Sequence, residues 1–388
     1  MPVELDRAII IALREYLESR QAEALALVRA LVETESPSGD WEGSCAVVDQ
    51  LAKRAAAIGG VSVVERIASP GYGEHLRVRA FAGGSDNALL VLGHTDTVHP
   101  RGTLQARPLR EEDDRLYGPG VFDMKANCVL ALEALGALSA LRISLRRAVT
   151  LLLTCDEEAG SMTGRALVEE EARRAAAVLV LEPPAAGRRV KTARKGTGMY
   201  TLEVEGRAAH AGLEPEKGAS AILEIARQIA RIHALNDPAR GTTLNVGVVC
   251  GGTSSNVVAA QARAEIDVRF ATFDEARRID QELRSMQPFD ERVKIRIGGG
   301  INRPPLERTA AVVGLFERAR RIAAHLDFEL GEASVGGASD GNFAAAVGAT
   351  VLDGLGVDGD GAHAAHEHIV KSDIPRRGAL LAGLIASL

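Results

Sequence analysis

The sequence predicts an α/β protein with a mostly parallel central sheet, into which a second domain is inserted. Short apolar runs at 88–92, 148–153 and 177–181 each end in polar residues, with helical stretches at about 124–140 and 163–173 between them. Continuous apolar strands that alternate with helices are typical of a parallel sheet covered on both faces. From about residue 196 apolar and polar residues alternate instead, which is typical of half-buried strands and marks the second domain.

The segments that flank these runs are also expected to be largely helical. Residues 4–34 have helical periodicity, a turn follows at 36–40, and a further helix is expected over about 42–58. After the insertion a helix is predicted at 308–325, followed by a final segment of mixed character. These elements complete the first domain.

The inserted domain is expected to be a ferredoxin-like sandwich. Its predicted elements are a strand at 199–205, a helix at 217–235, strands at 242–249 and 262–270, a helix at 274–286 and a strand at 292–297. The order β-α-β-β-α-β is that of the ferredoxin-like fold. With residues 302–305 as the return linker, we expect one domain over 1–194 and 304–388 and the insertion over 195–303.

The composition is that of a globular protein and excludes several classes of function. The 388 residues are 46% hydrophobic and 25% charged, with only 3% aromatic residues and a net charge of -6. Few aromatic rings and a negative charge argue against a nucleic-acid partner. No apolar run reaches the ~18–20 residues that span a bilayer, so no membrane partner is expected. The N-terminal segment is predicted to be an amphipathic helix and not a signal peptide. The four cysteines form no C-x-x-C pair, which favours reduced thiols in a cytoplasmic protein.

Polar side chains gather at the predicted carboxyl ends of strands and in adjoining turns. Ligands bind at that edge of a parallel sheet. Each residue alone has a simpler explanation: a surface turn, a helix N-cap for the aspartate that opens a helix, or a solvated acidic pair. The residues concerned are His94, Asp96, Asp123, Glu157, Glu158, Glu182 and His363.

Together these residues match the requirements of a two-metal site. Two ions about 3.5–4 Å apart need one bridging carboxylate, and a histidine and a carboxylate for each ion. The inventory of such ligands is His94, Asp123, Glu158, Glu182 and His363. Glu157 remains beside a ligand, where it could take a proton from water and return it to a leaving nitrogen. Asp96 could hydrogen-bond the far ring nitrogen of His94.

Three motifs resemble the signature of the di-zinc exopeptidases and deacylases, a family that includes glutamate carboxypeptidase, acetylornithine deacetylase, succinyl-diaminopimelate desuccinylase and peptidase T. They are GHTDTV at 93–98, YGPGVFDMK at 117–125 and DEEAGS at 156–161. The resemblance implies two Zn²⁺ per subunit, with Co²⁺ or Mn²⁺ as alternatives. It implies that His94 and Glu182 hold one ion, that Glu158 and His363 hold the other, and that Asp123 bridges them, often with a cis peptide bond after it. Glu157 matches the general base and Asp96 the carboxylate that orients the first histidine.

The final histidine ligand has to be chosen from the segment GAHAAHEH at 361–368. The family pattern is a histidine, three residues and then a glutamate. His363 and Glu367 satisfy this pattern, whereas His366 and His368 do not. We therefore expect His363 to be the ligand and the other two to be supporting or exposed residues.

The resemblance also implies substrate-binding residues. His210, in GRAAHAG at 206–212, matches a histidine that reaches toward an active site, in dimers that of the partner subunit, and that could stabilise an oxyanion. Asn256 and Arg269 match residues that contact the substrate carboxylate, and a cross-strand ion pair is the alternative for Arg269. Gly337 belongs to a glycine-rich loop beside the substrate. A homodimer through the inserted dimerisation or lid domain is implied, and strand 199–205 could offer an edge for pairing.

We therefore expect a zinc-dependent metallopeptidase that cleaves the amide bond to a C-terminal amino acid, often glutamate, of an N-acyl amino acid or small peptide. Leu-Glu-Pro at 181–183 and GASDGN at 337–342 favour the glutamate carboxypeptidase subgroup. The alternatives are a deacylase that releases acetate or succinate, and a plain aminopeptidase. A catalytically silent binding protein would have a broken ligand set, and here the set is complete.

Overall fold

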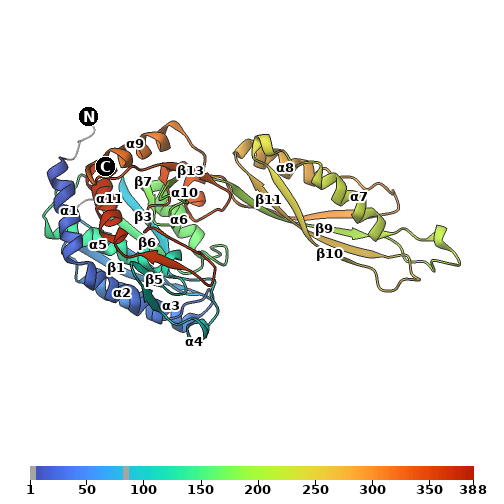
Figure 1. Ribbon diagram of the computed structural model, residues 1–388. Helices are drawn as coiled ribbons and strands as arrows, with labels where there is room; N and C mark the ends of the chain where they lie inside the picture. Colours follow the sequence, from blue (N-terminus) through green and yellow to red (C-terminus); the bar gives the residue numbers. More distant parts are fainter. Residues whose placement is uncertain (1–5, 82–86) are drawn as a thin grey trace. The chain divides into compact units, whose positions relative to one another are not determined.

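The computed structural model describes residues 6–81 and 87–388, which form two compact units (Figure 1). The first unit comprises the described residues up to Ala193, together with Arg308–Val335 and Ser339–Leu388. The second comprises Arg194–Glu307 and Gly336–Ala338. The second unit is therefore inserted into the chain of the first.

The first unit is built on a six-stranded sheet with the order β1-β2-β6-β3-β7-β14. The neighbours β6, β3, β7 and β14 are parallel, whereas β1 and β2 form an antiparallel hairpin at one edge. This confirms the predicted α/β class with a mostly parallel sheet. The strands are β1 (Val61–Ser69), β2 (Gly73–Ala80), β3 (Ala88–His94), β6 (Val149–Thr154), β7 (Ala175–Val180) and β14 (Val351–Leu352).

Helices cover both faces of this sheet, which explains why its strands are continuously apolar. Leu89 and Val91 of β3 belong to the core that includes residues of α5 and α11. Leu90 and Leu92 are equally buried and point to the opposite face, since side chains alternate along a strand, and α6 contacts β3 and β7. The helices are α1 (Arg7–Ser19), α2 (Gln21–Glu33), α3 (Trp41–Ala56), α4 (Thr103–Ala106), α5 (Ala126–Ala140), α6 (Gly164–Arg174), α9 (Ala310–His325), α10 (Gly341–Ala346) and α11 (Asp373–Ser387).

Two details of the first unit differ from the sequence prediction. Within the described residues, the helical stretch predicted at 4–34 is two helices, which meet at Arg20 with φ -100° and ψ -1°; residues 4 and 5 lie outside the described part. Short strands also form two small sheets, and each of these strands is too short to show the alternation of apolar and polar residues that predicts a strand. They are β4 (Arg110–Glu112), β5 (Arg115–Tyr117), β15 (Gly359–Asp360) and β16 (His368–Val370) in one sheet, and β8 (Val190–Arg194) and β13 (Glu332–Val335) in the other.

The second unit has the predicted β-α-β-β-α-β order and an antiparallel sheet, β10-β11-β9-β12. Tyr200, Leu202, Ile266 and Phe270 on the sheet form a buried core with apolar residues of both helices. The two inner strands, β9 and β11, alternate buried with more exposed residues, so one sheet face is covered by helices and the other is open. The elements are β9 (Gly196–Glu205), α7 (Ala221–His233), β10 (Thr243–Gly251), β11 (Gln261–Phe270), α8 (Phe273–Arg284) and β12 (Lys294–Arg303).

The strand order corrects two expectations about the second unit. Residues 199–205 cannot supply a free edge, because β9 is hydrogen-bonded to β11 on one side and to β12 on the other. The free edges belong to β10 and β12. Asn302 and Arg303, expected in a linker, are the last residues of β12. Among the described residues, every helix is too short or too polar to cross a bilayer.

Candidate metal centre

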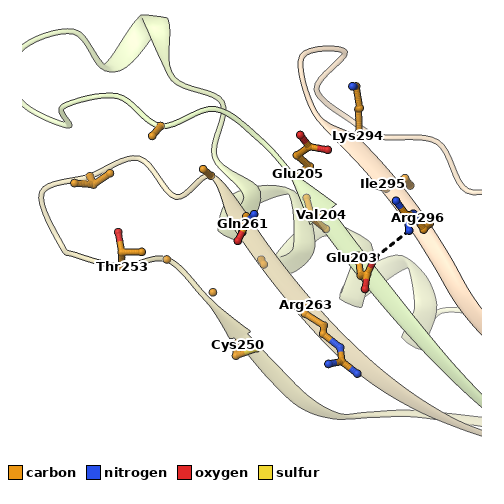
Figure 2. Close-up of a pocket in the computed structure, with 16 residues that line it drawn as sticks. Glu203, Val204, Glu205, Cys250, Thr253, Gln261, Arg263, Lys294, Ile295 and Arg296 are labelled. Carbon is orange, nitrogen blue, oxygen red and sulfur yellow. Dashed lines mark ion pairs between the residues drawn. The ribbon is translucent and has the colours of Figure 1, made fainter.

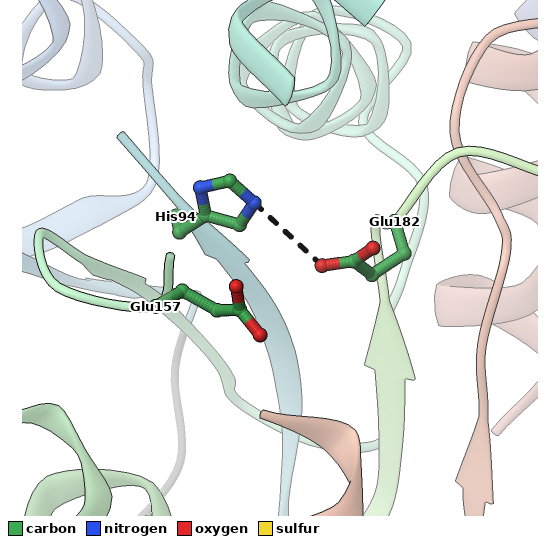
Figure 3. A group of neighbouring side chains, drawn as sticks. All are labelled: His94, Glu157 and Glu182. Atoms are coloured by element: carbon green, nitrogen blue, oxygen red, sulfur yellow. Dashed lines mark ion pairs between the residues drawn. The ribbon is translucent and has the colours of Figure 1, made fainter. Parts of the chain in front are cut away.

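The candidate centre lies where three parallel strands of the first unit end. His94 is the last residue of β3, while Glu157 follows β6 and Glu182 follows β7. Since these strands are parallel neighbours, their carboxyl ends meet at one edge of the sheet. Figure 3 shows the three side chains pointing toward one another, and their ligand atoms all lie within 4.8 Å of each other.

Asp123 lies between the two histidines that the sequence singled out. It belongs to an irregular turn, Val121–Lys125, that leads into α5, and its peptide bond to Met124 is cis, as the resemblance implies. Asp123 Oδ1 is 3.2 Å from His94 Nε2, and Oδ2 is 3.5 Å from His363 Nε2. Its two oxygens therefore face two different imidazoles.

Each histidine also faces a glutamate. His94 Nε2 is 3.6 Å from Glu182 Oε1, and His363 Nε2 is 3.0 Å from Glu158 Oε1. The structure thus brings together two histidine–glutamate pairs on either side of Asp123. His94, Asp123 and Glu158 also offer ligand atoms within 4.8 Å of one another.

Asp96 connects the first histidine to the acidic loop after β6. Its backbone oxygen is 3.0 Å from His94 Nδ1, and its carboxylate Oδ1 is 3.4 Å from the same nitrogen. The carboxylate also accepts the backbone N–H groups of Glu157 and Glu158, at 3.2 and 3.1 Å. One buried residue therefore contacts both His94, most closely through its backbone oxygen, and the loop that carries the two glutamates, through its carboxylate.

The charges of the cluster favour bound cations. Hydrogen bonds with Asp123 and Glu158 raise the pKa of His363 to about 10. Burial lowers the pKa of His94, but its hydrogen bonds with Asp123 and Asp96 outweigh burial and hold this pKa well above its usual value. Burial would raise the pKa of Asp123, whereas its bonds to His363 and His94 hold it far below the usual range. The carboxylates thus create a strongly negative potential at both imidazoles.

The donor set fits divalent ions that prefer nitrogen and oxygen ligands. A backbone oxygen only accepts hydrogen bonds, so in the neutral ring of His94 the proton lies on Nδ1 and the Nε2 lone pair faces Asp123 and Glu182. This is the arrangement of a metal-binding imidazole whose other nitrogen is held by the protein. Imidazole with carboxylate suits zinc, cobalt and manganese.

His363 differs from the other histidines of its segment. Its side chain is 51% exposed, and its backbone has φ 65°, a left-handed conformation that costs a non-glycine residue of order 1–3 kcal/mol and is concentrated at functional sites. His368 Nδ1 instead donates a hydrogen bond to the backbone oxygen of His366 at 2.9 Å, and its ring packs against Tyr117. Of the three, His363 is the one whose ring nitrogen meets Glu158 and Asp123.

The expected substrate residues all lie in the second unit, so their contacts are described within it. His210 Nδ1 accepts the backbone N–H groups of Gly212 and Leu213, both at 3.1 Å, which places the ring proton of the neutral form on Nε2. Asn256 lies on the adjoining loop, where its backbone oxygen accepts the N–H of Ala211.

Arg269 and Gly337 make different local contacts. Arg269 Nε and Nη2 donate to the two carboxylate oxygens of Asp267, each at 2.9 Å, so its ion pair is with a residue two positions away on β11 and not across strands. The backbone oxygen of Gly337 accepts a hydrogen bond from Arg194 Nη1 at 3.1 Å.

The second unit also contains a pocket of about 960 Å³, which the expected substrate residues do not line (Figure 2). It lies at one end of the sheet, and its lining mixes acidic and basic side chains, among them Glu203 and Arg296, which form an ion pair at 3.9 Å. His210, Asn256 and Arg269 are not part of this lining.

Several residues to which the sequence assigned no role hold the centre in place. One is Glu367, whose buried carboxylate accepts backbone N–H groups of the turn that carries Asp123. Asp340 accepts hydrogen bonds from Thr154 and Ser161, at the two ends of the acidic loop after β6. The sequence signal that could have pointed to Glu367 is the histidine-x₃-glutamate pattern. For Asp340 the corresponding signal is its position in the glycine-rich loop.

Comparison with known proteins gives the family of the chain. The model of "Peptidase family M20/M25/M40" matches residues 90–387. The chain belongs to this family. Carboxypeptidase G2 of Pseudomonas sp. (strain RS-16) is 31% identical over 375 residues, which cover 95% of this chain and 90% of that protein.

Other M20 relatives differ in their named activities. Succinyl-diaminopimelate desuccinylase of Delftia acidovorans is 29% identical over 322 residues, 77% of this chain and 81% of that enzyme. The crystal structure of aminopeptidase PepT from Bacillus cereus has the same fold, with a TM-score of 0.75 and 21% identity over 95% of this chain and 98% of that chain. The M20 chain described here is therefore a hydrolase of a metal-dependent family that usually uses zinc, with a candidate metal site at the strand ends.

Proposed function

We propose that this M20 hydrolase cleaves the amide bond between an acyl or peptidyl group and a C-terminal amino acid, with glutamate as the amino acid released. The observation that carries the proposal is that two histidine–glutamate pairs flank Asp123. Glu157 lies next to the pair formed by His94 and Glu182. The similarity to carboxypeptidase G2 along 95% of the chain supports a carboxypeptidase.

Two zinc ions are the proposed cofactors. His94 and Glu182 would hold one ion, Glu158 and His363 the other, and the two oxygens of Asp123 would be shared between them. Bound at this position, the ions would supply Lewis acidity that makes water a stronger acid and polarises the substrate carbonyl.

Glu157 is the proposed general base and acid. Its side chain is largely buried, and its backbone N–H is fixed by the carboxylate of Asp96. The carboxylate of Glu157 accepts a proton from the attacking water and then delivers it to the nitrogen of the departing amino acid. The same carboxylate is regenerated at the end of each turnover.

The second unit is proposed to recognise the substrate. Arg269 has five N–H donors, of which Asp267 takes two, so its guanidinium is held in place and still has donors for a substrate carboxylate. His210, with the proton of the neutral ring on Nε2, can donate a hydrogen bond to the developing oxyanion. By their resemblance to family motifs, Asn256 would contribute to carboxylate binding and Gly337 to the loop beside the substrate.

The proposed assembly is a homodimer formed through the second unit, with His210 serving the partner's centre. Ile222 and Leu223 on α7 and Val248 and Val249 on the free edge strand β10 are exposed apolar residues. Exposed apolar residues on and near an unpaired strand edge are suited to association. A Val249→Asp protein should sediment as a monomer and lose activity, and an active monomer would overturn the role of His210 in the partner.

A reducing compartment is proposed for the protein. All four cysteines are free, and two of them, Cys128 and Cys155, are buried. Free thiols are typical of the cytoplasm. Recovery of the native protein from its host in an oxidising extracytoplasmic fraction would contradict this.

A second candidate is an N-acyl amino acid deacylase with the same centre, favoured by the similarity to succinyl-diaminopimelate desuccinylase. A substrate panel separates the two. The purified, zinc-loaded protein should release glutamate from N-acyl and folate-like glutamates and lose this activity with a chelator. Turnover restricted to N-acetylornithine or N-succinyl-diaminopimelate would assign the chain to the deacylases, and no turnover of any amide would overturn the proposal.

A further inference from the structure

We propose that Glu367 is a positioning residue that holds the two loops bearing Asp123 and His363 at a fixed separation; this rests on the metal centre of the proposed function. Glu367 lies four residues after His363 and is 2% exposed. It has no place in the ligand set or in the proton transfers assigned above. Its contacts nevertheless tie it to both ligand loops.

The carboxylate of Glu367 accepts four hydrogen bonds, two at each oxygen. Oε1 accepts the backbone N–H groups of Phe122 and Asp123, at 2.9 and 3.0 Å. Oε2 accepts the backbone N–H of Gly120 at 2.9 Å and faces His99 Nε2 at 2.6 Å. A carboxylate has about four acceptor sites, so this one is fully used.

Two of these donors, Phe122 and Asp123, belong to the turn that presents Asp123, and Gly120 directly precedes it. The turn is irregular, since Asp123 has φ -117° and ψ 89° and Met124 has φ -141° and ψ 39°. N–H groups in such a backbone lack the carbonyl partners that a regular helix supplies, and buried N–H groups need an acceptor. Glu367 supplies that acceptor from the loop of His363, so its side chain joins the two loops, in addition to the backbone hydrogen bond from the N–H of Gly118 to the oxygen of Glu367.

His99 supports Glu367 from the opposite side. Its Nδ1 lies 3.3 Å from Arg107 Nη2, and a guanidinium can only donate. His99 Nδ1 therefore accepts, and its Nε2 carries the proton that is donated to Glu367. All four groups around the carboxylate of Glu367 therefore donate hydrogen bonds to it.

This arrangement matters for metal binding because the joined residues are proposed ligands. His363 Nε2 and Asp123 Oδ2 are 3.5 Å apart, so a shift of one loop changes the distance between two ligands directly. Metal sites tolerate ligand displacements of only about 0.2 Å. A glutamine at 367 would fill the same space, but its NH₂ group would face two N–H donors and could not accept from them.

The test compares Glu367→Gln with a matched control, Glu171→Gln. Glu171 is also a buried carboxylate of the first unit, 4% exposed, and it accepts hydrogen bonds from Arg77 and Arg79, both at 2.9 Å. Metal-free proteins are titrated with Co²⁺ in a calorimeter, the visible spectrum of the cobalt protein is recorded, and the melting temperature is measured without metal.

We expect Glu367→Gln to bind Co²⁺ about 10- to 100-fold more weakly and to change the cobalt spectrum, since supporting residues of metal ligands have effects of this size. Glu171→Gln should lower the melting temperature but keep the wild-type affinity and spectrum. His99→Leu should weaken binding in the same direction, and His99→Gln, which keeps a donor near the position of Nε2, should restore most of the affinity.

Wild-type affinity and spectrum in Glu367→Gln, with a melting temperature lowered as in Glu171→Gln, would overturn the positioning role and leave the proposed function intact. If Glu367→Gln does not fold, His99→Leu decides, and wild-type cobalt binding by that variant overturns the proposal. A wild-type protein that binds no Co²⁺ would overturn the proposed function and this inference together.

Discussion

The carboxylate of Asp96 accepts the backbone N–H of Glu157 at 3.2 Å, so the residue that supports His94 also fixes the position of the proposed base. Asp96 is 2% exposed and additionally accepts the N–H of Glu158 and the hydroxyl of Ser38. The proposed ligand and the proposed base are thus positioned by the same residue. This link predicts that metal binding and proton transfer fail together when Asp96 is altered.

Asp96→Asn should lower both metal affinity and turnover. An asparagine must place its NH₂ group against the N–H of Glu157 or Glu158, which moves the acidic loop. We expect about 10- to 100-fold weaker zinc binding and a lower kcat. Calorimetry and kinetics measure the two effects. Ser38→Ala, which removes one hydrogen bond to Asp96 and leaves both backbone bonds, should have a much smaller effect on both; equal effects would contradict this account.

Glu157→Gln separates proton transfer from metal binding. The glutamine has the size of the native side chain but cannot accept the proton of water, so kcat should fall about 10²- to 10⁴-fold. Zinc content, measured by elemental analysis, should equal that of the wild type. Glu170→Gln, an exposed change on α6, should keep full activity. A Glu157→Gln protein with full zinc and full turnover would refute the assignment of the base.

Arg269→Lys tests recognition of the substrate carboxylate. Lysine keeps the charge but loses the planar fork held by Asp267, so KM should rise about 10- to 100-fold with a smaller change in kcat. Arg263→Lys is the matched control, because Arg263 also lies on β11 and pairs with an acid two positions away, Glu265. An equal rise in KM for both variants, or none for Arg269→Lys, would show that Arg269 has no special role.

Glu275 predicts a pH dependence for the stability of the second unit. Hydrogen bonds from Arg278, and also from Thr242 and Arg240, lower its pKa from 4.5 to about 2. Because the folded-state pKa is the lower one, the stabilisation is fully present above pH 4.5 and is lost as the pH falls toward 2. Glu275→Gln should therefore cost about 2 kcal/mol in unfolding free energy at pH 7.

Urea unfolding followed by circular dichroism tests this at several pH values. The difference between Glu275→Gln and the wild type should shrink between pH 4.5 and 2. Asp274→Asn, a change in an exposed neighbour on the same helix, should show little difference at any pH. A constant Glu275→Gln difference down to pH 2 would contradict the ionic origin of the stabilisation.

The features of the fold and site that the sequence predicts are those that depend on the pattern of apolar and polar residues within a short segment. His94, Glu158 and Glu182 could be singled out because each follows a continuous apolar run, and the parallel order of β3, β6 and β7 then brings them together. The strand order of the second unit has no local signature, so the inner position of β9 was missed. The contacts of Glu367 were missed for the same reason: its partners in the turn of Asp123 lie 244 to 247 residues earlier in the chain.

The most direct test of the account is the number of metal ions that the chain binds. Calorimetric titration of the metal-free protein with Zn²⁺ should show two ions per chain. His363→Ala should keep one tightly bound ion, because His94, Asp123 and Glu182 remain together. A wild-type chain that binds a single ion or none, or a His363→Ala chain that still binds two with unchanged affinity, would contradict it.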